Sequence, residues 1–205
     1  MKKKIIVDIL MFILMLLEFS RNYMEPIYHE IFGIILLILV IIHLTLNMNY
    51  FKTLFKGNYN INRMIMLIIN IGFFITFITS LILGVLSSQE LLRFLNIGSL
   101  TIIKLHKILA YISLLFLGLH LGINFNAMFG KITKHKIIFY ILEVIISIYG
   151  IYSFIKLDII KHITGTYGFS MIEGNIIINI LRYFSIIMLF AFIMYNTNKL
   201  MKKEK

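Results

Sequence analysis

The chain has 205 residues, of which 60% are hydrophobic, and its formal net charge is +11 at pH 7. Long apolar stretches separated by short polar segments exclude an ordinary soluble domain and predict an all-α membrane protein. The chain has no cysteine, which excludes disulfides, thiolate metal sites, iron–sulfur clusters and covalently attached c-type haem. In a membrane chain the positive charge indicates cytoplasmic loops, and not nucleic-acid binding.

The first predicted transmembrane helix covers about residues 4–20 and follows a basic start, MKKK. A secretory signal is disfavoured because no small-residue cleavage site follows it. Asp8 and Glu18 lie near the two ends of this helix, where we expect interfacial water to solvate them. The only proline, Pro26, stands where a first helical turn is predicted, and a second helix over about 26–50 follows.

Four further apolar stretches predict helices over about 62–87, 100–127, 136–156 and 175–198. The first of these four contains small or polar residues that most simply make helix-packing contacts, namely Asn70, Thr76, Thr79, Ser80 and Gly84. The sequence thus predicts six transmembrane helices. We expect a four-helix core in residues 1–130, and two additional helices with a basic tail in residues 131–205.

The distribution of positive charge predicts the orientation of these helices. With the N-terminus inside, thirteen of the twenty Lys and Arg fall in cytoplasmic segments and six in outer segments, while Arg182 lies within the last helix. We therefore expect a multi-pass protein of a bacterial cytoplasmic membrane, surrounded by lipid, with both termini in the cytoplasm.

One segment of the chain occurs twice. HEIFGIILLILVIIHLTLN at 29–47 aligns with HKILAYISLLFLGLHLGIN at 106–124, and each copy carries two histidines fourteen residues apart, namely His29, His43, His106 and His120. On a helix this spacing places both histidines on nearly one face, about 21 Å apart. Because the two helices would run parallel, His29 is expected level with His106 near the outer surface, and His43 level with His120 near the cytoplasm.

Opposed imidazoles between apolar helices suit haem iron, whose porphyrin fills the other four coordination positions. The sequence predicts two non-covalent b-type haems with these four histidines as axial ligands. Such iron has no open position and favours electron transfer over oxygen binding. Small residues would admit the flat macrocycle, namely Gly33, Ala110, Gly118 and Gly122. Lys104 and Lys107 would pair with haem propionates, although snorkelling to the membrane surface explains them nearly as well.

Other interpretations of the polar residues compete with this one. A histidine in an apolar helix can be a hydrogen-bonded structural residue, although ionisable groups at membrane depth are costly and usually functional. A small transporter or channel could use Glu143, Arg182 and the histidines as a polar pathway. A membrane zinc enzyme would need a His-Glu-x-x-His helix or a compact three-ligand cluster. His135 and His162 lie outside the repeated register and are expected at the surface, with a quinone contact as the lesser alternative for His162.

The chain resembles the flavinylation-associated cytochrome family, bacterial relatives of transmembrane cytochromes b. The likeness covers about residues 5–127 and lies in His-Glu at 29–30, Gly33, His-Leu-x-Leu-Asn at 43–47, Ser80, Gly84, His-Lys at 106–107 and His-Leu-Gly at 120–122. The resemblance implies a di-haem cytochrome that passes electrons across the membrane to exported flavoproteins carrying covalent FMN. A quinol or a cytoplasmic flavin enzyme would be the donor.

Overall fold

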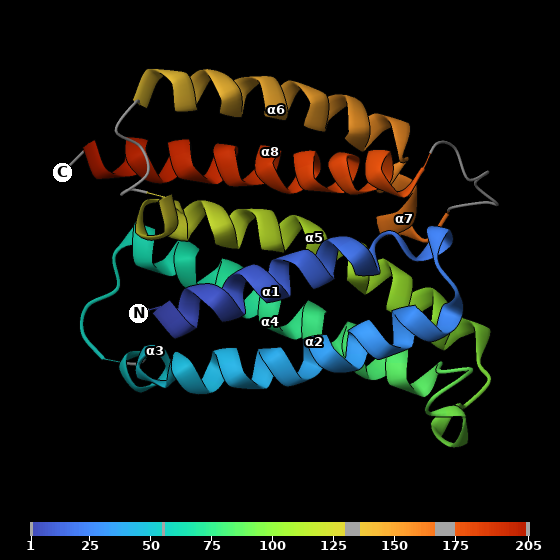
Figure 1. Cartoon of the computed structure of the whole chain (residues 1–205). Helices are drawn as coiled ribbons and strands as arrows, with labels where there is room; N and C mark the ends of the chain where they lie inside the picture. The colour runs from blue at the N-terminus through green and yellow to red at the C-terminus, as the bar shows by residue number, and fades with distance from the viewer. Residues whose placement is uncertain (1, 55, 130–135, 167–174, 204–205) are drawn as a thin grey trace.

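Helices form all the secondary structure in the part of the chain that the computed structural model describes, which is residues 2–54, 56–129, 136–166 and 175–203 (Figure 1). Five of them are long and apolar enough to cross a membrane, and the chain is a multi-pass membrane protein. These five are α2 (Pro26–Leu46), α4 (Ile61–Leu86), α5 (Leu100–Phe129), α6 (Lys136–Lys156) and α8 (Ile176–Lys203).

The remaining predicted span corresponds to α1 (Lys2–Glu18), which has 17 residues. This length is at the lower limit for crossing a hydrocarbon layer about 30 Å thick. The outward side of α1 is nevertheless apolar, since Ile5, Ile6, Ile9 and Ile13 are exposed. Such a surface is suited to lipid contact.

The connections contain short helices that the sequence did not predict. The predicted second helix is divided at Asn47 into α2 and α3 (Met48–Thr53). Two 3₁₀ turns, η1 (Arg21–Tyr23) and η2 (Arg93–Leu95), lie in loops. The connection after α6 forms α7 (Ile159–Thr164), which ends at Gly165 with a φ of 69°. Glycine adopts this left-handed conformation without steric cost, and it lets the chain turn back.

The long helices pack in a regular order. Figure 1 shows α6 beside α8 and α8 beside α5, with α4, α1 and α2 on the other side of α5. The closely packed pairs include α4 with α5, α5 with α8, α6 with α8, and α1 with α2, whereas α2 and α5 are not closely packed. The two helices that carry the repeat are therefore separated by a space that side chains occupy.

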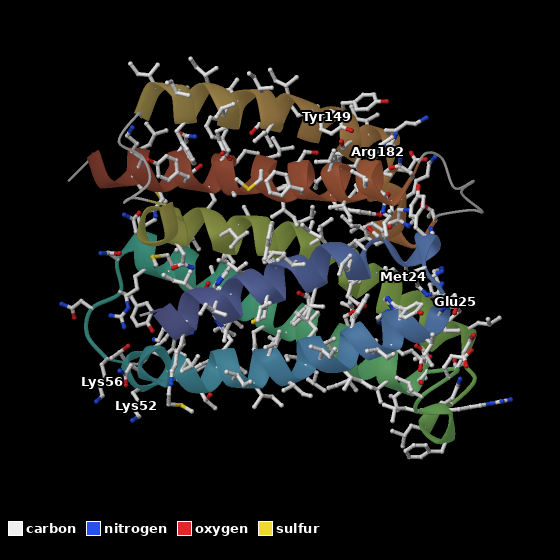
Figure 2. All side chains as sticks on the ribbon, in the orientation of Figure 1. Met24, Glu25, Lys52, Lys56, Tyr149 and Arg182 are labelled. Atoms are coloured by element: carbon white, nitrogen blue, oxygen red, sulfur yellow. The ribbon has the colours of Figure 1, made fainter. Side chains whose placement is uncertain are left out.

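The two ends of the helix bundle differ in the segments they contain. The start of α1, the end of α8 and α3 lie together at one end, where Figure 2 shows Lys52 and Lys56. Met24, Glu25 and Arg182 lie at the opposite end. In Figure 1 both α2 and α5 run toward the end that contains α3, so the two repeat helices are parallel. We call the α3 end the inner end and the opposite end the outer end.

Candidate functional site

The structure brings together the first histidine of each repeat copy. The rings of His29 on α2 and His106 on α5 have centroids 6.2 Å apart and planes inclined at 74°. Because α2 and α5 are parallel, equivalent positions of the repeat lie at the same level of the bundle. This pair forms the outer level of the candidate site.

Helix α4 holds the His106 ring. His106 Nδ1 donates to Ser80 O at 2.8 Å, and the Ser80 hydroxyl donates to His106 O at 3.1 Å. Gly84, one turn further along α4, leaves room for the ring, because a Cβ there would lie 3.1 Å from His106 Cε1. The Ser80 and Gly84 positions, which contributed to the family resemblance, thus orient one imidazole and leave its Nε2 available.

Helix α1 provides the neighbour of the other outer histidine. His29 Nδ1 lies 2.8 Å from Glu18 Oε2, a close ion-pair contact whose angle does not make it a directed hydrogen bond. Both side chains are largely buried, at 21% and 15% exposure. The sequence expectation that Glu18 is a solvated end charge is wrong, because the residue faces His29.

Glu30 fixes the loop that follows α4. Its carboxylate accepts hydrogen bonds from the Ser88 hydroxyl at 2.6 Å and from the backbone N–H groups of Gln89, Glu90 and Leu91 at 2.7, 3.1 and 2.8 Å. Donors that converge on an ionised acceptor form the stronger class of hydrogen bond. Glu30 therefore ties α2 to the loop between α4 and α5 beside the outer histidines.

Replacing Glu30 with Gln should loosen this loop. The side chain loses its charge and one of two acceptor atoms, while hydrogen bonds to charged groups contribute about 1.5–3 kcal/mol each. We expect amide hydrogen exchange at Gln89 and Leu91 to accelerate about tenfold or more, measured by mass spectrometry. The Glu90→Gln variant is the matched control, because the Glu90 side chain is exposed; equal acceleration in both variants would contradict the assignment.

The second histidine of each copy forms the inner level. His43 Nδ1 donates to Asp8 Oδ1 at 2.7 Å, so Asp8, like Glu18, is not the solvated end charge expected from the sequence. The Asn47 amide donates to His43 O at 2.9 Å and lies at 3.5 Å from both ring nitrogens of His43. Because α2 and α5 are parallel, His43 is expected level with His120 on α5.

His120 is oriented by a relay of two polar side chains. Its Nδ1 donates to Asn70 Oδ1 at 2.9 Å, and the Asn70 amide group donates to the Tyr50 hydroxyl at 2.9 Å. The second hydrogen bond fixes which end of the amide faces the histidine. Asn70, which the sequence indicated as a helix-packing residue, therefore contacts an imidazole of the repeat.

Both repeat copies are also buried at their midpoints, between their two histidines. Leu36 and Ser113 are equivalent positions of the repeat, and each is 1% exposed. Leu114, beside Ser113, is completely buried. The two copies thus bury the same face at their midpoints as well as at their histidines.

A cavity of about 700 Å³ includes the outer level. Its wall contains both outer histidines together with polar and aromatic residues of several other segments, among them Arg21, Asn22, Ser80, Lys107, Tyr111 and His162. Cavities of about 300–1,000 Å³ are typical of sites for small ligands and cofactors. The outer histidines therefore face a space of the size that a cofactor needs.

The predicted accessory residues have different surroundings. Lys107 lines the cavity, whereas the Lys104 side chain lies against Gly165 after α7. Gly33 lies beside the Glu18 carboxylate, at 3.9 Å from the position of a Cβ. Gly122 faces α8, since a Cβ there would lie 2.4 Å from Ala191 O. Gly118 also faces α8, so these two glycines permit close helix packing.

An aromatic cluster borders the cavity where α7 meets α5. The His162 ring stacks on Tyr111 with centroids 4.2 Å apart and an interplanar angle of 5°. The Tyr111 and Tyr183 hydroxyls are hydrogen-bonded at 2.9 Å. Burial, followed by the Lys107 ammonium, lowers the pKa of His162, while Asp158 opposes this effect. His162 is therefore half-buried at the cavity wall, and His135 lies outside the described residues.

Glu143 and Arg182 are not brought into one site. Glu143 on α6 is 5% exposed. Gly150, seven residues later, packs on Ser185 of α8, and Arg182 lies beyond that contact because the two helices are antiparallel. The two charges are thus separated by about 15 Å along the helix axes, which does not favour a single polar pathway through them.

The donor set fits haem better than a bare metal ion. The described residues contain no group of three or more His, Cys, Asp or Glu side chains that could hold a metal. Haem requires only two axial ligands. Imidazoles bound to opposite sides of one metal through bonds of about 2 Å have ring centres roughly 6 Å apart, close to the 6.2 Å between His29 and His106.

No protein-family model, curated protein or solved structure matched the chain when it was compared with them.

Proposed function

We propose that this chain is a di-haem b-type cytochrome that carries electrons across a bacterial cytoplasmic membrane. His29 and His106 would be the axial ligands of the outer haem, and His43 and His120 those of the inner haem. In this proposal α1 is the sixth span, both chain termini are cytoplasmic, and the two additional helices α6 and α8 flank the haem-binding core.

One observation supports this proposal most strongly. In each of the four repeat histidines Nδ1 lies within 2.9 Å of an oxygen atom, contributed by Glu18, Asp8, Ser80 or Asn70. Metal-binding histidines typically direct their second ring nitrogen to a carboxylate, a carbonyl or water, which fixes the ring and leaves the other nitrogen for the metal. A purely structural histidine would not need the same arrangement in four equivalent places.

The bound group and the protein would have separate roles. A bis-imidazole haem supplies a reversible one-electron iron couple with no open coordination position. The four histidines hold the two levels about 21 Å apart on each helix. Leu36 and Ser113, midway between the two histidines of each copy, are buried. These residues therefore define a route along the helix axes.

The family resemblance supports the choice of electron acceptor, and it leaves two classes of donor open. A quinol or a cytoplasmic flavin enzyme would reduce the protein, and an exported FMN-binding flavoprotein would receive the electrons. The outer cavity carries Arg21 and Lys107 on its wall, so the outer level has positive charge near it. This charge suits haem propionates and also an anionic flavin phosphate.

Reduced-minus-oxidised absorbance of the purified protein tests the proposal. We expect the sharp bands of a b-type haem and a stoichiometry of two haems per chain. A colourless protein, expressed with haem in excess, would contradict the proposal and leave the transporter interpretation.

The two lysines beside His106 are expected to differ in their effects. Lys107 lines the cavity and Lys104 does not. A nearby cation stabilises the reduced and less positive iron, so Lys107→Ala should lower the midpoint potential of the outer haem. Lys104→Ala should leave it unchanged. Potentiometric titration measures both, and equal shifts in the two variants would assign the effect to general surface charge.

A further inference from the structure

The acceptors that face the four histidines are divided between charged and neutral groups. Both carboxylates, Asp8 and Glu18, lie on α1 and contact the imidazoles of α2. The imidazoles of α5 face neutral oxygens on α4, namely Ser80 O and Asn70 Oδ1. At each level, therefore, one histidine faces a carboxylate and the other faces a neutral oxygen.

The antiparallel packing of α1 on α2 creates this division. Asp8 lies opposite His43 and Glu18 opposite His29, so two carboxylates ten residues apart reach two histidines fourteen residues apart. Lys4 holds the same end of α1 through a hydrogen bond to Asn47 at 3.1 Å. The sequence repeat does not predict these contacts between carboxylates and histidines, because α1 lies outside both copies.

The surroundings of Glu18 favour a positive charge close by. Its Oε1 is buried and has no hydrogen-bond partner among the described residues, while Oε2 has the contact with His29. A buried carboxylate is costly unless a positive group compensates for its charge. Arg21 supplies part of this compensation, and oxidised haem iron bound to His29 would supply more.

We infer that Asp8 and Glu18 are positioning residues that set the reduction potentials of the two haem levels separately, Asp8 at the inner level and Glu18 at the outer. This inference rests on the proposed function. A carboxylate at Nδ1 makes the imidazole a stronger donor to the metal. Its negative charge also stabilises the oxidised iron more than the reduced iron. Both effects lower the potential.

The first experiment is a redox titration of the Asp8→Asn and Glu18→Gln variants in the purified, haem-loaded protein. Each substituted amide retains an oxygen that can accept from Nδ1, so two haems per chain should remain. In each variant we expect the equilibrium constant for reduction of one haem to increase about tenfold. For a one-electron couple this is a rise of about 59 mV in the midpoint potential. The two variants should shift different haems.

Matched variants separate this local effect from general charge and from packing. Glu25→Gln removes an exposed carboxylate from the same outer end as Glu18 (Figure 2), and should shift neither potential. Lys4→Arg alters the contact between α1 and α2 at Asn47 while keeping its positive charge, and should also shift neither. Asp8→Glu restores the charge and should return the inner potential toward the wild-type value.

The reciprocal variant tests the inference even if an α1 variant loses its haem. Asn70→Asp places a carboxylate against His120 in place of a neutral oxygen. Reduction of the inner haem should therefore become about tenfold less favourable, which is a fall of about 59 mV in its potential. Unchanged potentials in Asp8→Asn, Glu18→Gln and Asn70→Asp would overturn the inference and leave the di-haem function intact. A wild-type protein without haem would instead contradict the proposed function itself.

Discussion

Replacing His106 with Leu is expected to lower the haem content from two groups to one per chain. The variant removes one of the two axial ligands at the outer level, while the inner pair keeps both. Leucine is close to histidine in size and cannot bind a metal, so the helix bundle should still form. The ratio of haem to protein, together with the reduced-minus-oxidised spectrum, measures the loss.

The inner level should respond in the same way and independently. His43→Leu should also leave one haem, with the midpoint potential of the outer group, and the double variant His43→Leu, His106→Leu should leave none. His135→Leu serves as the control because this histidine stands outside the repeated register. Two haems in either single variant, or any haem in the double variant, would contradict the assignment of these ligands.

The helices and the pairing of the repeat copies could be predicted from the sequence. Continuous apolar stretches locate α2, α4, α5, α6 and α8 to within a few residues, because length and hydrophobicity decide membrane insertion. The parallel direction of α2 and α5 follows from the single span between them. Equivalent positions of two parallel helices lie at the same height, so His29 is predicted level with His106. The 6.2 Å between their ring centroids agrees with this prediction.

The partners of the histidines could not be predicted in this way. Asp8, Glu18 and Asn70 lie on helices outside the repeat, and an apolar helix shows no clear preference for the side that faces its neighbours. Hydrophobicity cannot distinguish lipid from a buried helix contact in a membrane. The rotation of α1 and α4 about their axes, which directs these side chains at the imidazoles, is determined by packing in three dimensions.

The short helices could not be predicted either, because their position also depends on packing in three dimensions. The segment that forms α7 has only six residues, too few to show a helical period. Its place against α5 depends on the left-handed turns at Asp158 and Gly165. The sequence predicts His162 at the surface because it lies in a connection outside the repeated register, whereas the turn brings it onto Tyr111.

Gly122→Ala is expected to destabilise the protein without removing haem. A Cβ at this position would lie 2.4 Å from Ala191 O and 2.8 Å from Met194 Cβ. The obstacle is the backbone of α8, so α5 and α8 must move apart. Overpacking of this kind costs about 1–3 kcal/mol. Thermal unfolding in detergent should therefore occur at lower temperature, while two haems per chain remain.

Gly33→Ala provides the comparison that decides between packing and cofactor contact. Its Cβ would meet only Glu18 Oε2, at 3.9 Å, which is an ordinary contact, so the unfolding temperature should not change. If Gly122→Ala instead reduced the haem content and left the unfolding temperature unchanged, Gly122 would belong to the cofactor site, as the sequence predicts. The distance from Gly122 to the α8 backbone favours the packing result, because a main-chain carbonyl cannot rotate out of the way as a side chain can.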